Sequence, residues 1–147
     1  MSQTTWAARP LPLSEPTFTH SRAFREVAEG TSDMIAVLDS AGRRLYANPA
    51  FERLLNRGEF VSGSDSFIHI HPQDRSRVRK LFMRVLSERQ GQKARYRIID
   101  RSGKVRLIES RSHLVHCEEG LAPRVMVISW ELGTTSTRAG DISGVCP

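Results

Sequence analysis

The spacing of apolar residues changes once along the chain, and this change limits the folds that are open to it. Between residues 72 and 90, apolar residues recur every three or four positions, as they do on one face of a helix. From residue 92 to residue 131 they alternate with polar residues, which is typical of strands with one buried face. The sequence therefore predicts one long amphipathic helix followed by a β-rich final third.

Before the long helix, turn signals separate a short helix from two strands. Ser21 can cap a helix whose apolar face contains Phe24 and Val27. Residues 34–39 and 43–48 have the composition of strands, and the turn between them contains Asp followed three positions later by Gly. These signals predict a helix followed by a β-hairpin.

Pro and Gly residues mark the expected ends of the helices. Asn48-Pro49 predicts the start of a second helix, because Asn caps free N–H groups and Pro has a helical φ. We expect Gly30, Gly58 and Gly91 to end the three helices, with Gly30 in the left-handed conformation.

The final third contains three predicted strands, residues 92–100, 105–116 and 123–131. With the preceding elements they give an α+β domain, in which helices cover one face of an antiparallel sheet. The chain of 147 residues has room for one such domain. We expect three parts: a flexible leader (1–18), the folded domain (19–132) and a disordered tail (133–147).

Charge is distributed unevenly. The net charge is +6, and residues 75–111 alone contain 13 basic and 3 acidic residues. Such a region can attract phosphate or an acidic partner, but aromatic residues that could stack on bases do not alternate with these arginines.

The first 16 residues contain no secretory signal, and no apolar run is long enough to span a bilayer, so we expect a cytoplasmic protein. Cys117 and Cys146 have no metal-ligand spacing, and we expect reduced thiols.

Several short motifs occur in an order that is known from one family. They are Asp33-Met34-Ile35, Tyr46-Ala47-Asn48-Pro49-Ala50-Phe51, His71-Pro72-Gln73-Asp74, Tyr96-Arg97 and Val105-Arg106-Leu107-Ile108-Glu109. With these motifs, residues 24–132 resemble a PAS domain, the sensory module of many bacterial signalling proteins. One departure is Glu131-Leu132-Gly133, which stands where many members have an Asp-Ile-Thr turn.

The resemblance implies a PAS fold: a five-stranded antiparallel sheet in the order 2-1-5-4-3, with helices on one face and an N-terminal flanking helix. Such domains enclose a small molecule between sheet and long helix, or dimerise, and pass a change to an output domain. On this basis we expect a signal-transduction module, a sensor without an enzymatic activity of its own. An alternative is the input domain of a sensor histidine kinase, as in a two-component system, or of a diguanylate cyclase. In that case the catalytic part is absent from this chain. A second alternative is binding of nucleic acid or an acidic partner through the basic region.

The resemblance and the inward-facing positions of the strands together indicate a candidate site. Ser110 and Ser112 are small and polar at positions where a filled core would have larger apolar residues. They indicate either a hollow with hydroxyl groups or two serines bonded to backbone carbonyls. Phe24 and Val27 are the candidate surface for a homodimer. The predicted pocket wall consists of Phe51, Leu55, Phe82, Tyr96, Ile98, Ile108, Ser110, Ser112, Met126 and Ile128.

No cofactor is identified by these residues. Residues 73–90 contain no histidine to serve as an axial haem ligand, and residues 48–90 contain no cysteine for a flavin adduct. A non-covalent flavin beside Trp130 stays open. A pair of His69 and His71 lacks further metal ligands, and no nucleophile with a matching His and carboxylate is recognisable. We therefore predict no catalytic and no metal site.

Overall fold

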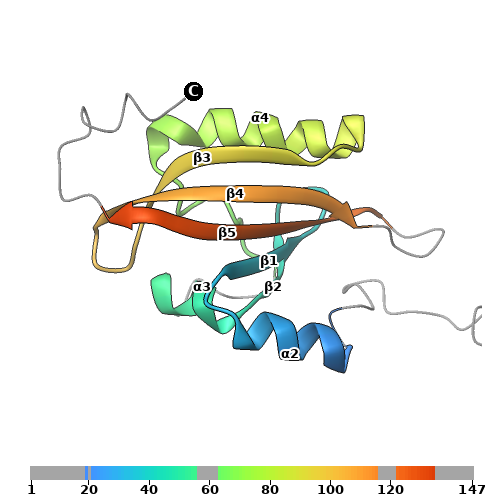
Figure 1. Cartoon of the computed structure of the whole chain (residues 1–147). Coiled ribbons are helices and arrows are strands. Elements are labelled where there is room, and N and C mark those ends of the chain that lie inside the picture. Colours follow the sequence, from blue (N-terminus) through green and yellow to red (C-terminus); the bar gives the residue numbers. More distant parts are fainter. Residues whose placement is uncertain (1–18, 20, 56–62, 116–121, 135–147) are drawn as a thin grey trace, which may run out of the picture.

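The computed structural model describes residues 19, 21–55, 63–115 and 122–134 (Figure 1). Within these residues, three helices and five strands form one α+β domain. In chain order they are α2 (Arg22–Gly30), β1 (Met34–Leu38), β2 (Arg44–Ala47), α3 (Pro49–Leu54), α4 (Pro72–Glu88), β3 (Gln92–Ile99), β4 (Val105–Val115) and β5 (Arg124–Thr134). The last strand runs two residues beyond the end that the sequence predicts for the domain.

All five strands pair antiparallel in the order β2-β1-β5-β4-β3, which confirms the predicted sheet. The helix α4 lies along β3 at one edge of the sheet, and α3 packs against β1 nearer the other edge (Figure 1). The main core lies between these helices and one face of the sheet. Its most deeply buried members are Leu55, Val85, Ile108 and Val125.

The opposite face of the sheet is covered in part by α2. The Phe24 ring meets the Tyr46 ring edge-on, with the centroids 5.3 Å apart. Tyr46 pairs with Val37, and cross-strand partners lie on the same face of a sheet. Because Val37 and Ile35 alternate with Ala36, which faces the main core, α2 lies on the outer face.

Two tight turns have the chemistry that the sequence predicts. The Asp39 carboxylate accepts hydrogen bonds from the backbone N–H groups of Ala41 and Arg43, and Gly42 has a φ of 83°. Gly42 also lies against Phe67, because a Cβ atom there would come within 2.4 Å of the ring. The turn after β3 repeats the pattern, with Gly103 at a φ of 87°.

The helix ends agree with the prediction only in part, since α2 ends at Gly30 as expected. Neither Gly30 nor Gly91 adopts a positive φ. The helix α4 instead ends at Glu88, and Arg89 takes the left-handed conformation at a φ of 56° while its N–H donates to the Val85 carbonyl. The helix therefore ends before Gly91, and β3 begins directly after this glycine, at Gln92. Gly58 lies outside the described residues.

Asn48 joins three elements at one point of the structure and is completely buried. Its Oδ1 atom accepts hydrogen bonds from Ile35 N at 3.0 Å and from Phe51 N at 3.2 Å. Its Nδ2 group donates to the carbonyls of Ala28 at 2.7 Å and Asp33 at 2.9 Å. The residue that starts α3 therefore also fixes the end of α2 and the start of β1.

Replacing Asn48 with alanine leaves four backbone groups without these partners, two of them in fully buried hydrogen bonds and two in partly buried ones. We expect the free energy of unfolding to fall by about 3 kcal/mol, because each unsatisfied buried group costs roughly 1 kcal/mol or more. Chemical denaturation measures this loss. Ser40→Ala, in the exposed turn, is the control and should change stability by less than about 0.5 kcal/mol. Equal stability of the two variants would contradict the central role of Asn48.

Candidate functional site

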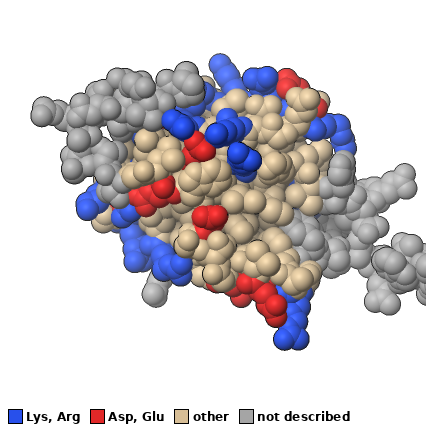
Figure 2. All heavy atoms as spheres, viewed as in Figure 1, with Lys and Arg blue, Asp and Glu red and all other residues tan. Residues whose placement is uncertain are grey.

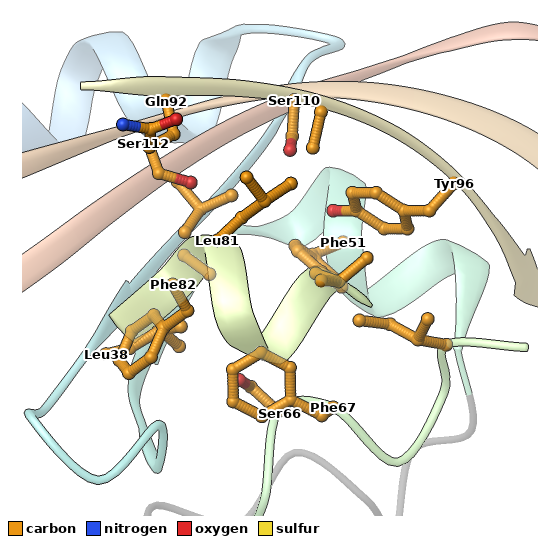
Figure 3. Close-up of a pocket in the computed structure, with 15 residues that line it drawn as sticks. Leu38, Phe51, Ser66, Phe67, Leu81, Phe82, Gln92, Tyr96, Ser110 and Ser112 are labelled. Atoms are coloured by element: carbon orange, nitrogen blue, oxygen red, sulfur yellow. The ribbon is translucent and has the colours of Figure 1, made fainter. Parts of the chain in front are cut away.

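A cavity lies inside the main core, between α3, α4 and the inner face of the sheet (Figure 3). We call it the core cavity. The centre of a water molecule can reach about 60 Å³ of it. The described residues that line it are Ala36, Leu38, Phe51, Ser66, Phe67, Ile70, Val78, Leu81, Phe82, Gln92, Ala94, Tyr96, Ser110, Ser112 and Val127.

One side of the core cavity is polar and is supplied by β3 and β4. Gln92 pairs with Ser112 across the two strands, and Ala94 pairs with Ser110. Since side chains alternate between the two faces of a strand, Gln92, Ala94 and Tyr96 all face the cavity. Figure 3 shows the Tyr96 and Ser110 oxygens directed into the space. The polar groups therefore form a row along one wall.

The Tyr96 phenol is neutral at ordinary pH. Burial raises its pKa above the usual value of 10.0, and hydrogen bonding with Ser110 and Ser129 opposes the rise. Ser129 pairs with Ser110 on the inner face of the sheet and is buried, yet its Oγ atom reaches no partner at full hydrogen-bond geometry among the described residues. Its contact with the phenol is accordingly a weak one. The phenol thus keeps capacity to bond to something else in the cavity.

The facing side of the core cavity is mainly apolar, and its Ser66 hydroxyl donates to the Gly42 carbonyl at 2.8 Å (Figure 3). The rings of Phe67 and Phe82 meet edge-on with centroids 5.3 Å apart, and Phe51 comes from α3. Leu81, which is half-buried, projects from α4 into the space (Figure 3). Phe67 is held from behind, where the Arg79 guanidinium lies 4.4 Å from the ring centroid.

A buried ion pair fixes the start of α4 on β3. Asp74 and Arg97 form two hydrogen bonds between their side chains, of 2.7 and 2.9 Å, and the Asp74 carboxylate also accepts from the Arg97 backbone N–H at 2.9 Å. Burial alone would raise the pKa of the Asp74 carboxyl, but the hydrogen bonds and charge of Arg97 bring it below its ordinary value of 3.8. Just before it, His71 caps the helix by accepting from Gln73 N at 3.1 Å.

The predicted pocket residues divide into three groups. Phe51, Phe82, Tyr96, Ser110 and Ser112 line the core cavity. Leu55, Ile98 and Ile108 are buried in the surrounding core but are not part of the lining. Met126 and Ile128 lie on the outer face of β5, where they pair with Val37 and Ile35, and so their predicted orientation is wrong.

The error on β5 has a simple cause. Residues 125–128 are all apolar, so hydrophobicity gives no sign of which alternate positions face inward. The register shows that Val127 faces the cavity, opposite Ser112. Sequence reasoning predicted that Phe67 points inward but missed Ser66 and Ile70, which come from the same connecting segment without any periodic pattern.

The two candidate interface residues differ in exposure. Phe24 is half-buried because it packs on Tyr46, whereas Val27 is 69% exposed.

In the part of the chain that is described, no three His, Cys, Asp or Glu side chains come together as metal ligands. Among the described helices, none is both long and apolar enough to cross a membrane. Cys117 and Cys146 lie outside the described residues.

Known proteins share this architecture. A family model described as the PAS fold matches residues 44–129, which is more than half of the chain. A comparison with curated proteins found no match. Among solved structures, the PAS domain of a protein from Colwellia psychrerythraea is 17% identical, with a TM-score of 0.66 over 76% of this chain and 95% of that chain.

Two further solved structures come from signalling proteins. The PAS domain of the Cronobacter turicensis quorum-sensing receptor RpfR, in complex with BDSF, is 18% identical, with a TM-score of 0.59 over 70% of this chain and 96% of that chain. A sensory box histidine kinase/response regulator from Burkholderia thailandensis is 23% identical, with a TM-score of 0.54 over 84% of this chain and 92% of that chain.

The sheet order, the long helix that packs on β3 and β4 and the flanking helix α2 define a small α+β domain. The match over residues 44–129 shows the family. The chain belongs to the PAS family.

The ion pair between Asp74 and Arg97 makes the stability of the domain depend on pH. The pKa of Asp74 is depressed in the folded state, so its contribution is complete above about pH 4 and is lost as the pH falls through the lower folded value. We expect Asp74→Asn to lower the free energy of unfolding at neutral pH by about 3 kcal/mol, because it leaves a buried guanidinium without its charge partner. The acid dependence should also become shallower. Denaturation curves at several pH values measure both effects.

Asp65→Asn is the matched control for this experiment. Asp65 also pairs with an arginine, Arg79, at 3.6 Å, but its side chain is 53% exposed. A pair of this kind contributes less than about 1 kcal/mol. If the two variants lost the same stability, the buried pair would not hold α4 in the way described.

Proposed function

We propose that this PAS domain binds a small molecule in the core cavity and that occupancy of the cavity is its signal. The observation that carries this proposal is the row of hydrogen-bonding side chains along an open space in the core. Protein cores are otherwise filled at high density, and buried polar groups normally bond to one another. A cavity with a few convergent polar groups and apolar walls is typical of a ligand site.

Relatives support a role in ligand binding. The RpfR PAS domain has been solved in complex with BDSF and also with C12:0. At 18 and 19% identity these structures share the fold with this chain but do not carry their ligands over to it. The proposal therefore rests on the cavity of this chain. It describes a sensor that changes a partner's activity and performs no reaction itself.

We propose in addition that the domain forms a homodimer through α2. The supporting observation is the 69% exposure of Val27, an apolar residue on a helix that otherwise turns Phe24 and Ala28 to the sheet. Met126, Ile128 and Trp130, on the outer face of β5, are further apolar side chains that are only half-buried. A second copy that packed there would remove these side chains from water.

We propose that the domain acts on a kinase, a diguanylate cyclase or a separate regulator protein. The similarity to the Burkholderia thailandensis sensory box histidine kinase/response regulator supports a kinase as one option, with this chain as an input domain. A diguanylate cyclase or a separate regulator protein is consistent with the same fold. The coding sequence next to that of this chain distinguishes these options, since an input domain requires a catalytic domain in the same reading frame.

Binding of nucleic acid through the basic region has weaker support. Many of its arginines are paired within the domain: Arg84 with Glu88, Arg95 with Glu109 and Arg106 with Asp100. Figure 2 shows Lys and Arg at separate places on the visible face, with Asp and Glu among them. Arginines that are already neutralised release fewer counterions from a phosphate backbone.

The ligand proposal predicts that filling the core cavity abolishes binding. Ser112→Leu places an apolar side chain in the space, whereas Ser76→Leu adds the same side chain to the exposed face of α4. We expect the first variant to carry roughly tenfold less of any small molecule that co-purifies with the protein, because the volume it needs is occupied. Mass spectrometry of the denatured protein measures this, and protein-observed NMR with a fragment library serves for protein that purifies empty. Equal behaviour of the two variants would refute the proposal.

The dimer proposal predicts a change in mass with one substitution. Val27→Glu places a charge at the centre of the proposed contact, which costs more than the contact gains. We expect a shift from dimer to monomer in sedimentation velocity, while Ser76→Glu, which adds the same charge to the exposed face of α4, leaves the dimer intact. A wild-type protein that is monomeric at high concentration would exclude the dimer.

A further inference from the structure

We infer that the ligand of the core cavity is electrically neutral, with a ring-sized apolar body and hydrogen-bonding groups along one edge. This inference rests on the proposed function and adds the chemical class of the ligand. It follows from the kinds of side chain in the lining and from the way they are arranged.

The first argument is the absence of charge. The chain contains 22 Lys and Arg and 16 Asp and Glu, yet none of the described residues that line the core cavity is charged. An ion that enters such a space loses its hydration and gains no opposite charge in return. A neutral ligand avoids this cost.

The second argument is that charged groups packed next to the lining have other partners. The Arg44 guanidinium lies 5.8 Å from the Phe51 ring centroid and donates to the Ser64 hydroxyl at 3.1 Å. Arg97 bonds to Asp74 at 2.7 Å, and Arg79 lies over the Phe67 ring and pairs with Asp65. Glu109 alternates with the cavity-facing Ser110 and so lies on the outer face, where Arg95 contacts it at 2.7 Å. Each of these groups already has a partner within the domain, so none of them provides a counter-ion for a charged ligand.

The third argument is the two-sided character of the lining. Gln92, Ser110, Ser112 and Tyr96 provide hydroxyl and amide groups, all from two adjacent strands. Hydroxyl groups and amides both donate and accept hydrogen bonds. Successive inward residues on a strand are about 7 Å apart, so these groups match polar atoms spread along one edge of a ligand. The rings on the other side match an apolar body.

The fourth argument concerns size and entry. The space of about 60 Å³ is smaller than the roughly 150 Å³ that accommodates benzene in an engineered cavity. Leu81 projects into this space, and Leu81, Gln92 and Ser112 are among the half-buried residues of the lining (Figure 3). Movement of the Leu81 side chain would therefore both open and enlarge the site. Leu81→Ala should reproduce the enlarged form.

Three probes of nearly the same shape test the inference. Benzamide is neutral, benzoate carries a negative charge and benzamidinium carries a positive charge. We expect benzamide to bind at least roughly tenfold more tightly than either ion, because the ions pay for desolvation in a site without counter-charge. Binding to wild-type protein and to Leu81→Ala is measured by NMR titration, with stronger binding of benzamide to the variant. Ser110→Ala should weaken benzamide binding in particular.

A charge placed in the lining should reverse the order of the probes. Gln92→Lys adds a positive charge at the half-buried rim of the core cavity, and we expect this variant to prefer benzoate to benzamide. Gln90→Lys is the matched control, since it adds the same charge to an exposed residue outside the lining. The control should keep the wild-type order.

The possible results separate this inference from the proposed function. Benzoate or benzamidinium binding at least as well as benzamide to the wild-type cavity would overturn the neutral ligand but keep the ligand site. If no probe binds to wild-type protein or to folded Leu81→Ala, both the neutral ligand and the cavity as a sensor site are overturned. Should Leu81→Ala fail to fold, the comparison between Gln92→Lys and Gln90→Lys decides the question of charge.

Discussion

The contact between Asp74 and Arg97 fixes the long helix on the sheet, and the core cavity depends on that placement. Three hydrogen bonds join the first turn of α4 to the middle of β3, and the pair is almost completely removed from water. Such a pair requires its geometry, because a displaced partner would leave a buried charge. The helix therefore cannot move toward the sheet at this end to close the space.

Small side chains on the sheet also keep the core cavity open. Ala94, Ser110 and Ser112 stand on the inner face of β3 and β4, where larger residues would reach α4. Open space in a core forfeits dispersion contacts, so it lowers stability unless something fills it. Other interactions of the fold offset this loss of stability. The best defined are the hydrogen bonds of Asn48 and the edge-on contact of the Phe67 and Phe82 rings.

Local chemistry accounts for what the sequence predicted correctly. The cap at Asn48-Pro49 and the Asp-to-Gly turns require few residues and no distant contact, and all were found where expected. The sheet order came from the resemblance to PAS domains, because non-neighbouring strands cannot be ordered from periodicity alone. The orientation of residues 125–128 was not predictable, since only the register with β1 and β4 selects Val127 over its neighbours. The segment containing Ser66 and Phe67 contributes to the site without any pattern, and its role depends on tertiary contacts such as that with Gly42.

The uncharged lining has a consequence for how a signal could reach the domain. A small molecule without charge pays little to enter hydrocarbon, so it permeates lipid bilayers unaided, whereas an ion of the same size does not. Its concentration becomes equal on the two sides of a membrane without a transporter or an energy source. A domain that selects such a molecule reads the chemical state of the surroundings directly, from whichever side of the membrane it occupies.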